Sequence, residues 1–366
     1  MFVTPKIAKI DTTGKLIIAF DIAMKKLDYY TELLRRLSQE SSNSLEVIRG
    51  TIANKTYEIN ALLKKLAALA LENGYTGLHI VCEPTGNYCH CLMRTARRLG
   101  HSTAWVSGEN VHKARVIENN DSGKDDTKDP RVIYMLATMG KQLVYRELPP
   151  LYKQLRELNR MFDAADERRT QMKNELHHLL IRLFCDYEMS KDFLYSPSGV
   201  ALMEIYHFSP YRIAEDSFEQ FCRRMREKVP RIQQKSLTSI FQAATSSVQH
   251  LLCDEELMML EQRLHFAFDD YWEVHNRRQS IRRQIEEAYQ KLWDAGENVP
   301  YADGVVLTAF HLGRIIGETG PLGDFAHWRV LFKYGGVNLR TRQSGKYKGK
   351  LRLSKKGRVA GSPRRI

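Results

Sequence analysis

Short apolar runs alternate with amphipathic stretches over residues 1–150. KLIIAFDIA, LHIVCE and STAWVS are apolar enough for buried β-strands, and SLEVIRGTI and LDYYTELL predict two more, although the last also fits a helix. TYEINALLKKLAALALENG has a helical period that Gly74 ends, and further helices are predicted over Tyr88–Leu99 and in DPRVIYMLATMGKQL, where Pro130 suits the first turn. Strands separated by helices of this length predict an α/β domain with a mixed or mostly parallel sheet.

Residues 151–293 carry two long heptad patterns. Steps of four and three through residues 151–183 and again through 257–292 meet apolar side chains with one exception in each series. Two such seams with charged outer faces predict coiled-coil helices, which either fold back on each other or pair between protomers. Turn signals at about residues 186–247 predict a small helical insertion. Its tyrosines are expected in a core or an interface: Tyr187, Tyr195 and Tyr206.

The last block, residues 294–366, predicts a small and mostly α-helical domain. YADGVVLTAFHLGRIIGETG predicts one helix and FAHWRVLFKYGGV a second, which Gly335 and Gly336 end. The stretch NLRTRQSGKYKGKLRLSKKGR then interleaves Arg, Lys, Gly and Ser. Glycines let a backbone approach phosphate closely and cations hold it there, so this stretch favours nucleic-acid binding.

Charge is concentrated in the same block. The net charge is +13, from 56 Lys and Arg against 43 Asp and Glu, and residues 325–366 contain 13 of the cations and no acid. The rest of the chain is therefore balanced. A segment this cationic is the electrostatic footprint of a protein that binds a polyanion. HWRVLFKYGGV and the glycine spacing favour an ordered nucleic-acid surface over a disordered basic tail.

The bulk composition narrows the class. A chain of 366 residues is long enough for about two or three domains with cores. Its apolar runs fall short of the roughly 20 residues of a membrane span, and MFVTPKIAKID lacks the apolar region of a secretion signal. The six cysteines are therefore expected as reduced thiols. Cys89, His90 and Cys91 lack the paired spacing of a structural zinc site, which favours partly buried thiols on a helix.

Four acids occupy positions that suit a metal-dependent nuclease. Asp21 closes LIIAFD, Glu83 closes LHIVCE, and Asp126 and Asp129 share one helix face in GKDDTKDPRVI. Functional groups of α/β sheets collect at strand ends, and carboxylates gathered there repel unless a cation lies between them. Oxygen ligands of this kind select Mg²⁺ or Mn²⁺. Each acid alone suits a helix cap, and Asp125 is an alternative ligand to Asp126, but the order of all four favours the metal site.

The same residues carry a resemblance to a known family. Asp21, Glu83 in EPTGNY, and the Asp126–Asp129 pair in a K-x-D-x-x-D frame resemble the DEDD transposases. These are RuvC-like enzymes of the insertion-sequence family numbered one hundred and ten, related to the pilin-gene invertase Piv. GVVLTAFHLGRIIGETG, F-x-x-W-x-x-L-F-K-Y-G-G-V, R-Q-S-G and L-S-K-K-G are similar to the family's second domain, so the resemblance covers most of the chain except the middle insertion.

The resemblance implies a fold of three parts. An α/β RuvC-like (RNase H-like) catalytic domain is expected over residues 1–150. A long helical coiled-coil middle with the insertion is expected over residues 151–293. A small, mostly α and basic C-terminal transposase domain is expected over residues 294–366.

The resemblance also implies a DNA recombinase with a composite active site. The carboxylates would bind Mg²⁺ around a scissile phosphate, and Ser344 in RQSGK matches the nucleophile that forms a covalent phosphoserine link. Ser354 in LSKKG is the competing serine, and a helix N-cap suits it better. The surrounding cations are expected to bind nucleic acid, the first four of them beside the pentacovalent phosphate: Arg340, Arg342, Lys346, Lys348, Lys350, Arg352, Lys355 and Lys356.

The partners implied by the resemblance are DNA at the element ends and the target, and a structured guide RNA that pairs with both. Further protomers are expected to assemble through the coiled coils into a dimer or tetramer, in the cytoplasm of a prokaryote and close to the nucleoid. One rival is a RuvC-like junction or structure-specific nuclease that uses the same carboxylates with water and forms no covalent intermediate. The other is a non-enzymatic nucleic-acid-binding coiled-coil protein.

Local departures from the family pattern bear on the site. Asp125 stands where the family has Thr, and Pro130 stands where it has a small residue, which alters the geometry around the Asp pair. The sequence Ala302–Val305 replaces the usual Pro-Gly-x-Gly turn and weakens a helix–hairpin–helix interpretation. Relatives continue with more helix beyond GSPRRI, so a shortened copy is expected.

Overall fold

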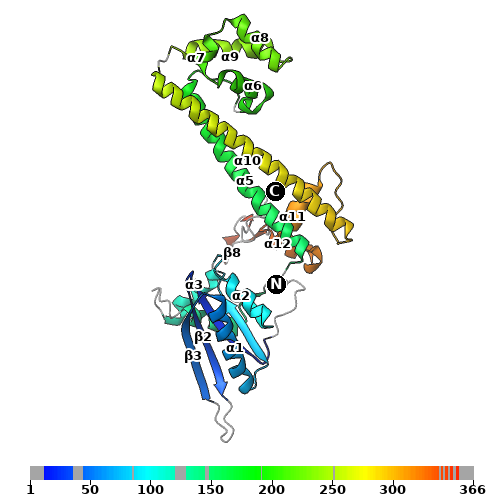
Figure 1. The fold of residues 1–366 in the computed structure, drawn as a ribbon. Helices are drawn as coiled ribbons and strands as arrows, with labels where there is room; N and C mark the ends of the chain where they lie inside the picture. The colour runs from blue at the N-terminus through cyan, green and yellow to red at the C-terminus, as the bar shows by residue number, and fades with distance from the viewer. Residues whose placement is uncertain are drawn as a thin grey trace. The chain divides into compact units, whose positions relative to one another are not determined.

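The computed structural model describes most of the chain (Figure 1). The described residues are 12–35, 44–84, 86–119, 129–144, 148–190, 192–249 and 252–337, with the short segments 339–340, 343–344, 347–348 and 352–353. The chain folds into two compact units, Met1–Glu147 and Leu148–Ile366.

The first unit is built on a mixed six-stranded sheet in the order β3-β2-β1-β4-β5-β6. β1, β2 and β3 form an antiparallel meander, β4 and β5 run parallel to β1, and β6 is antiparallel to β5. The strands are β1 Lys15–Ile22, β2 Lys26–Arg35, β3 Ser44–Ala53, β4 Gly77–Cys82, β5 Ser102–Val106 and β6 Gln142–Val144. The helices are α1 Thr56–Glu72, α2 His90–Arg98, α3 Gly108–Asn119 and α4 Asp129–Thr138.

Helices cover both faces of this sheet. Alternate residues of β1, such as Ile18 and Phe20, are buried in one core with α1 and α2. Ala19 and, on β4, Val81 are buried in a second core with α3 and α4. This two-sided packing confirms the α/β class predicted from the alternation of strand and helix signals. α3 and β6 were not predicted.

The second unit is organised by an antiparallel pair of long helices, α5 Pro150–Leu183 and α10 Asp254–Asp294. Their seam residues are mostly buried against each other, so the heptads predicted from the sequence fold back within one chain. The only seam positions occupied by charge are Arg169 and Arg278, and both pair with Asp166, at 3.2 and 2.7 Å. The two breaks in the heptads are therefore one polar layer.

The segment between the long helices forms its own helical core with one end of the pair. Tyr206 is buried there, and Tyr187 and Tyr195 pack against the same cluster, which confirms their expected place in a core. The elements of this insertion are η1 Phe193–Tyr195, α6 Pro197–Tyr206, α7 Pro210–Ala214, α8 Phe218–Lys228 and α9 Gln234–Ser247.

The C-terminal region begins with α11 Ala309–Thr319, which docks on α5 and α10. Glycines permit this close packing: a Cβ atom at Gly313 would lie 2.7 Å from Ile285 Cγ2, and one at Gly317 would lie 2.6 Å from Asn159 Nδ2. Beyond it lie η2 Leu322–Asp324, α12 Trp328–Tyr334 and four short strands, β7 Leu339–Arg340, β8 Gln343–Ser344, β9 Tyr347–Lys348 and β10 Arg352–Leu353.

The predicted start of this helix at Tyr301 is wrong. The Asp303 carboxylate accepts hydrogen bonds from the backbone N–H groups of residues 305–307, each at 2.9 Å, and holds them in a loop. The side chain of Thr308 then caps the helix by accepting from the His311 N–H. An aspartate turn followed by a threonine cap delays the helix by eight residues.

The six cysteines are free thiols, and Cys89 and Cys91 lie at the start of α2. Within the part of the chain that the structure describes, no helix is both long and apolar enough to cross a bilayer.

Candidate active site

The parallel pairing of β1 and β4 brings two of the predicted acids together. Phe20 pairs with Cys82 in the register; Asp21 is the next residue of β1, and Glu83 directly follows the end of β4. Their side chains share the face of Ala19 and Val81, which packs on α3 and α4, because side chains alternate along a strand. Both acids are partly buried. Two carboxylates from neighbouring strands therefore lie at one sheet edge and on one face.

The Glu83 side chain occupies the amino end of α3. A Cβ atom at Gly108, the first residue of that helix, would lie 3.2 Å from Glu83 Cδ and still closer to Oε1. The absence of a side chain at Gly108 therefore makes room for the carboxylate. The positive end of the helix dipole also favours a negative group at this place.

Asp28 is an acid of this edge that the sequence reasoning missed. It pairs directly with Asp21 in the β1–β2 hairpin, so the two side chains share one face. Its carboxylate accepts from the Thr51 hydroxyl and lies 3.1 Å from Lys26 Nζ. A strand acid between apolar neighbours was the available signal, but which residue it opposes depends on the hairpin register.

Asp129 begins α4 and is buried with 3% of its surface exposed. Both of its carboxylate oxygens accept from Arg115 of α3, with Nε at 2.6 Å from Oδ1 and a second bond from the other guanidinium nitrogen to Oδ2. A bidentate ion pair of this kind fixes the orientation of the carboxylate and balances its charge. Asp129 thus joins the two helices that cover the face of Asp21 and Glu83.

Carboxylate oxygens such as those of Asp21 and Glu83 are the donors that a hard divalent cation such as Mg²⁺ or Mn²⁺ prefers. Asp126 and its alternative Asp125 lie outside the described residues. Among the residues that are described, no three His, Cys, Asp or Glu side chains gather as a set of metal ligands. Three of the four predicted carboxylates are described, and Asp129 does not gather with Asp21 and Glu83 as a ligand set, so the site with four carboxylates stays a prediction.

His79 of β4 lies on the face of the sheet that packs on α3 and α4. It precedes Val81 by two residues and Glu83 by four. It is fully buried, with its ring nitrogens 2.9 Å from Ser102 Oγ and 2.6 Å from Gln142 Oε1. Burial lowers the pKa of this imidazole. His79 is therefore held neutral and supports the strand that presents Glu83.

Ser344, the predicted nucleophile, belongs to the second unit. It ends β8 and pairs with Tyr347 of β9 in a two-stranded antiparallel sheet. Arg340 of β7 pairs with Arg352 of β10 in a second two-stranded antiparallel sheet, and Lys348 lies on β9. The remaining predicted nucleic-acid ligands and the competing serine lie outside the described residues: Arg342, Lys346, Lys350, Ser354, Lys355 and Lys356.

Two family models match the chain. A DEDD transposase model matches residues 40–185, which include Glu83 and Asp129, and a model described as transposase of the IS116/IS110/IS902 family matches residues 310–360, which include Ser344. Together they cover more than half of the chain. No curated protein matches it in sequence. A structure of RuvC from Thermus thermophilus is similar over 35% of this chain and 98% of that chain, with 9% identity and a TM-score of 0.24, too distant to support an assignment.

Proposed function

This chain belongs to the IS110/IS116/IS902 family of DEDD transposases, and we propose that it cuts and rejoins the DNA strands of an insertion sequence through Ser344. The observation that carries the proposal is the β1–β4 register, which sets Asp21 beside Glu83 at one edge and on one face of the sheet. Two carboxylates held side by side repel each other, and a bound cation would offset that repulsion.

We propose Mg²⁺ or Mn²⁺ as the cofactor. Asp21 and Glu83 would hold the ion, together with Asp129 and with Asp126 or its neighbour Asp125. The chemistry that such an ion supplies when bound is polarisation of phosphate oxygens and activation of a hydroxyl. Arg115 orients the Asp129 carboxylate, and Gly108 leaves the space that the Glu83 carboxylate occupies.

Ser344 would act as the nucleophile. A bond would form between its Oγ atom and the phosphorus as the bond from phosphorus to the leaving strand's oxygen breaks, and the serine proton would pass, directly or through water, to that leaving oxygen. The phosphoserine link conserves the energy of the broken bond, and attack by the hydroxyl of a second strand releases the serine and rejoins DNA. Four flanking cations would neutralise the transferring phosphate: Arg340, Arg342, Lys346 and Lys348.

We further propose a guide RNA and additional protomers as partners. Because the heptad seams of α5 and α10 are buried against each other, protomers would assemble through the outer faces of this helix pair. Large apolar side chains are exposed on those faces: Met161 and Ile181 on α5, and Met258, Met259 and Phe266 on α10.

Strand cleavage by two variants separates the proposal from its rivals. Labelled element-end DNA is incubated with the protein, the flanking transcript and Mg²⁺. Ser344→Ala should abolish cutting, whereas a nuclease that uses water would still cut. Asp21→Asn should also abolish cutting, whereas in a non-enzymatic scaffold it would change no measured activity. Cutting by Ser344→Ala would overturn the serine mechanism.

A further inference from the structure

A pocket of about 370 Å³ lies between α1 and α2 in the first unit. Its lining residues are Thr56, His90, Cys91, Arg94, Thr95 and Arg98. Thr56 and Cys91 meet across the two helices, with 3.2 Å between Oγ1 and Sγ. α1 and α2 pack on the core that contains Phe20, so the pocket lies on the opposite face of the sheet from Asp21 and Glu83.

The lining of this pocket is cationic and rich in hydrogen-bond donors. Two guanidinium groups, an imidazole, two hydroxyls and a thiol line it, and no acid does. Arg94 and Arg98 are exposed and make no ion pair within the described part of the chain. A cationic pair without acidic partners is attracted to an anionic ligand.

The amino end of α1 strengthens the same preference. Thr56 is the first residue of this 17-residue helix, and its N-cap Lys55 makes no side-chain capping bond. The first turn of the helix contains one acid, Glu58, whose two carboxylate oxygens accept from Ala53 N and the Tyr57 hydroxyl. Glu58 keeps its negative charge but does not line the pocket, so the helix dipole still adds positive potential beside the two arginines.

We propose that this pocket binds a phosphodiester of a nucleic-acid backbone, distinct from the phosphate that is cut. Arg94 and Arg98 lie one helical turn apart, and their planar guanidinium groups suit bidentate hydrogen bonds to phosphate oxygens. Because the sheet separates them from Asp21 and Glu83, the backbone held there belongs to a bound stretch of nucleic acid that does not undergo cleavage. The pocket anchors substrate or guide rather than reacting with it.

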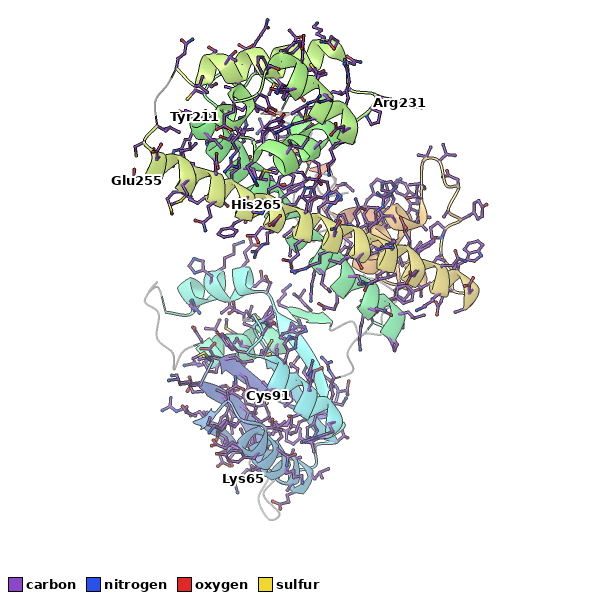
Figure 2. All side chains as sticks on the ribbon, turned by 45° about the horizontal axis from the view of Figure 1, so that its top comes forward. Lys65, Cys91, Tyr211, Arg231, Glu255 and His265 are labelled. Atoms are coloured by element: carbon purple, nitrogen blue, oxygen red, sulfur yellow. The ribbon has the colours of Figure 1, made fainter. Side chains whose placement is uncertain are left out.

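Equilibrium binding in EDTA tests this site without any cleavage, so its result is independent of the proposed chemistry. The full chain is titrated into labelled element-end duplex DNA and, separately, into the flanking transcript as RNA, at several salt concentrations. The double variant Arg94→Gln with Arg98→Gln is compared with a matched control, Lys64→Gln with Lys65→Gln. The control removes the same charge from α1 at exposed residues outside the pocket, and Figure 2 shows Lys65 well away from Cys91.

The arginine variant should lose at least about fivefold in affinity for one of the two nucleic acids. For two phosphate contacts, the slope of log K against log salt should become shallower by about 1.8 with duplex DNA or by about 1.4 with single-stranded RNA. The nucleic acid that shows the loss identifies the ligand. The lysine control should change affinity less than twofold. Arg94→Lys with Arg98→Lys should keep most of the salt slope, which excludes misfolding as the cause. Equal losses in the arginine and lysine variants, or no loss in the arginine variant with either probe, would overturn the proposal.

Discussion

The Glu83 carboxyl carbon lies 3.2 Å from the point that a Cβ atom would occupy at Gly108, the first residue of α3. Gly108→Ala should therefore displace the end of a flexible acid side chain and leave the backbone in place. We expect strand cleavage to fall by about tenfold or more, while the free energy of unfolding changes by less than about 1 kcal/mol. Paired cleavage assays and urea titrations measure both quantities. A variant that cuts as well as the parent would show that the position of Glu83 does not matter.

The ion pair of the partly buried Arg115 with the buried Asp129 should couple α3 to α4. Arg115→Gln leaves a buried carboxylate without its cation and should cost about 3 kcal/mol in the free energy of unfolding. The double variant Arg115→Gln with Asp129→Asn removes the uncompensated negative charge and should recover most of the lost free energy of unfolding. Urea unfolding of both single variants and the double variant completes the cycle. Strictly additive effects would contradict the pairing.

The docking of α11 on the long helices should depend on its glycines. Gly317→Ala would bring a methyl group against Asn159 Nδ2 and the Leu155 backbone, and overpacking of this kind costs about 1–3 kcal/mol. Gly323→Ala is the matched control, because a Cβ atom there meets nothing within 4 Å. Thermal unfolding of both variants compares them. Equal melting temperatures would show that α11 packs less closely than described.

The buried His79 should make the first unit sensitive to acid. Burial lowers the pKa of its imidazole in the folded state, so the unfolded chain binds the proton more readily. Its contribution is fully present above the unfolded pKa of about 6.5 and is lost as the pH falls through the lowered folded value. Urea unfolding at pH 7.5 and pH 5.5 should show a smaller loss of stability at pH 5.5 in His79→Gln than in the parent. An identical pH dependence in both proteins would contradict this role.

Local patterns along the chain predicted most of the fold. Heptads located α5 and α10, and apolar runs located the strands that end in Asp21 and Glu83, because burial of one face or one strand leaves a regular trace in the sequence. The start of α11 was missed because the Asp303 turn competes locally with an apolar helical pattern. Patterns of this kind predict which face of a segment is buried, but they do not predict which residues that face contacts.

The contacts of the site were less accessible to such reasoning. The register that opposes Asp28 to Asp21, the partnership of Arg115 with Asp129 and the close approach of Glu83 to Gly108 all join residues from different elements. They depend on tertiary packing, which no periodicity records. Asp125, Asp126 and most of the cations around Ser344 lie outside the described residues, so their roles stay predictions.

Metal-directed cleavage of the polypeptide tests the central claim most directly. Fe²⁺ is allowed to replace the divalent ion, and ascorbate with peroxide then generates radicals that cut the backbone within a few ångströms of the bound metal. We predict fragments that end near Asp21, near Glu83 and in the segment from Asp125 to Asp129, suppressed by excess Mg²⁺ and absent from the Asp21→Asn protein. Cuts elsewhere, or the same cuts in Asp21→Asn, would contradict a metal site at the ends of β1 and β4.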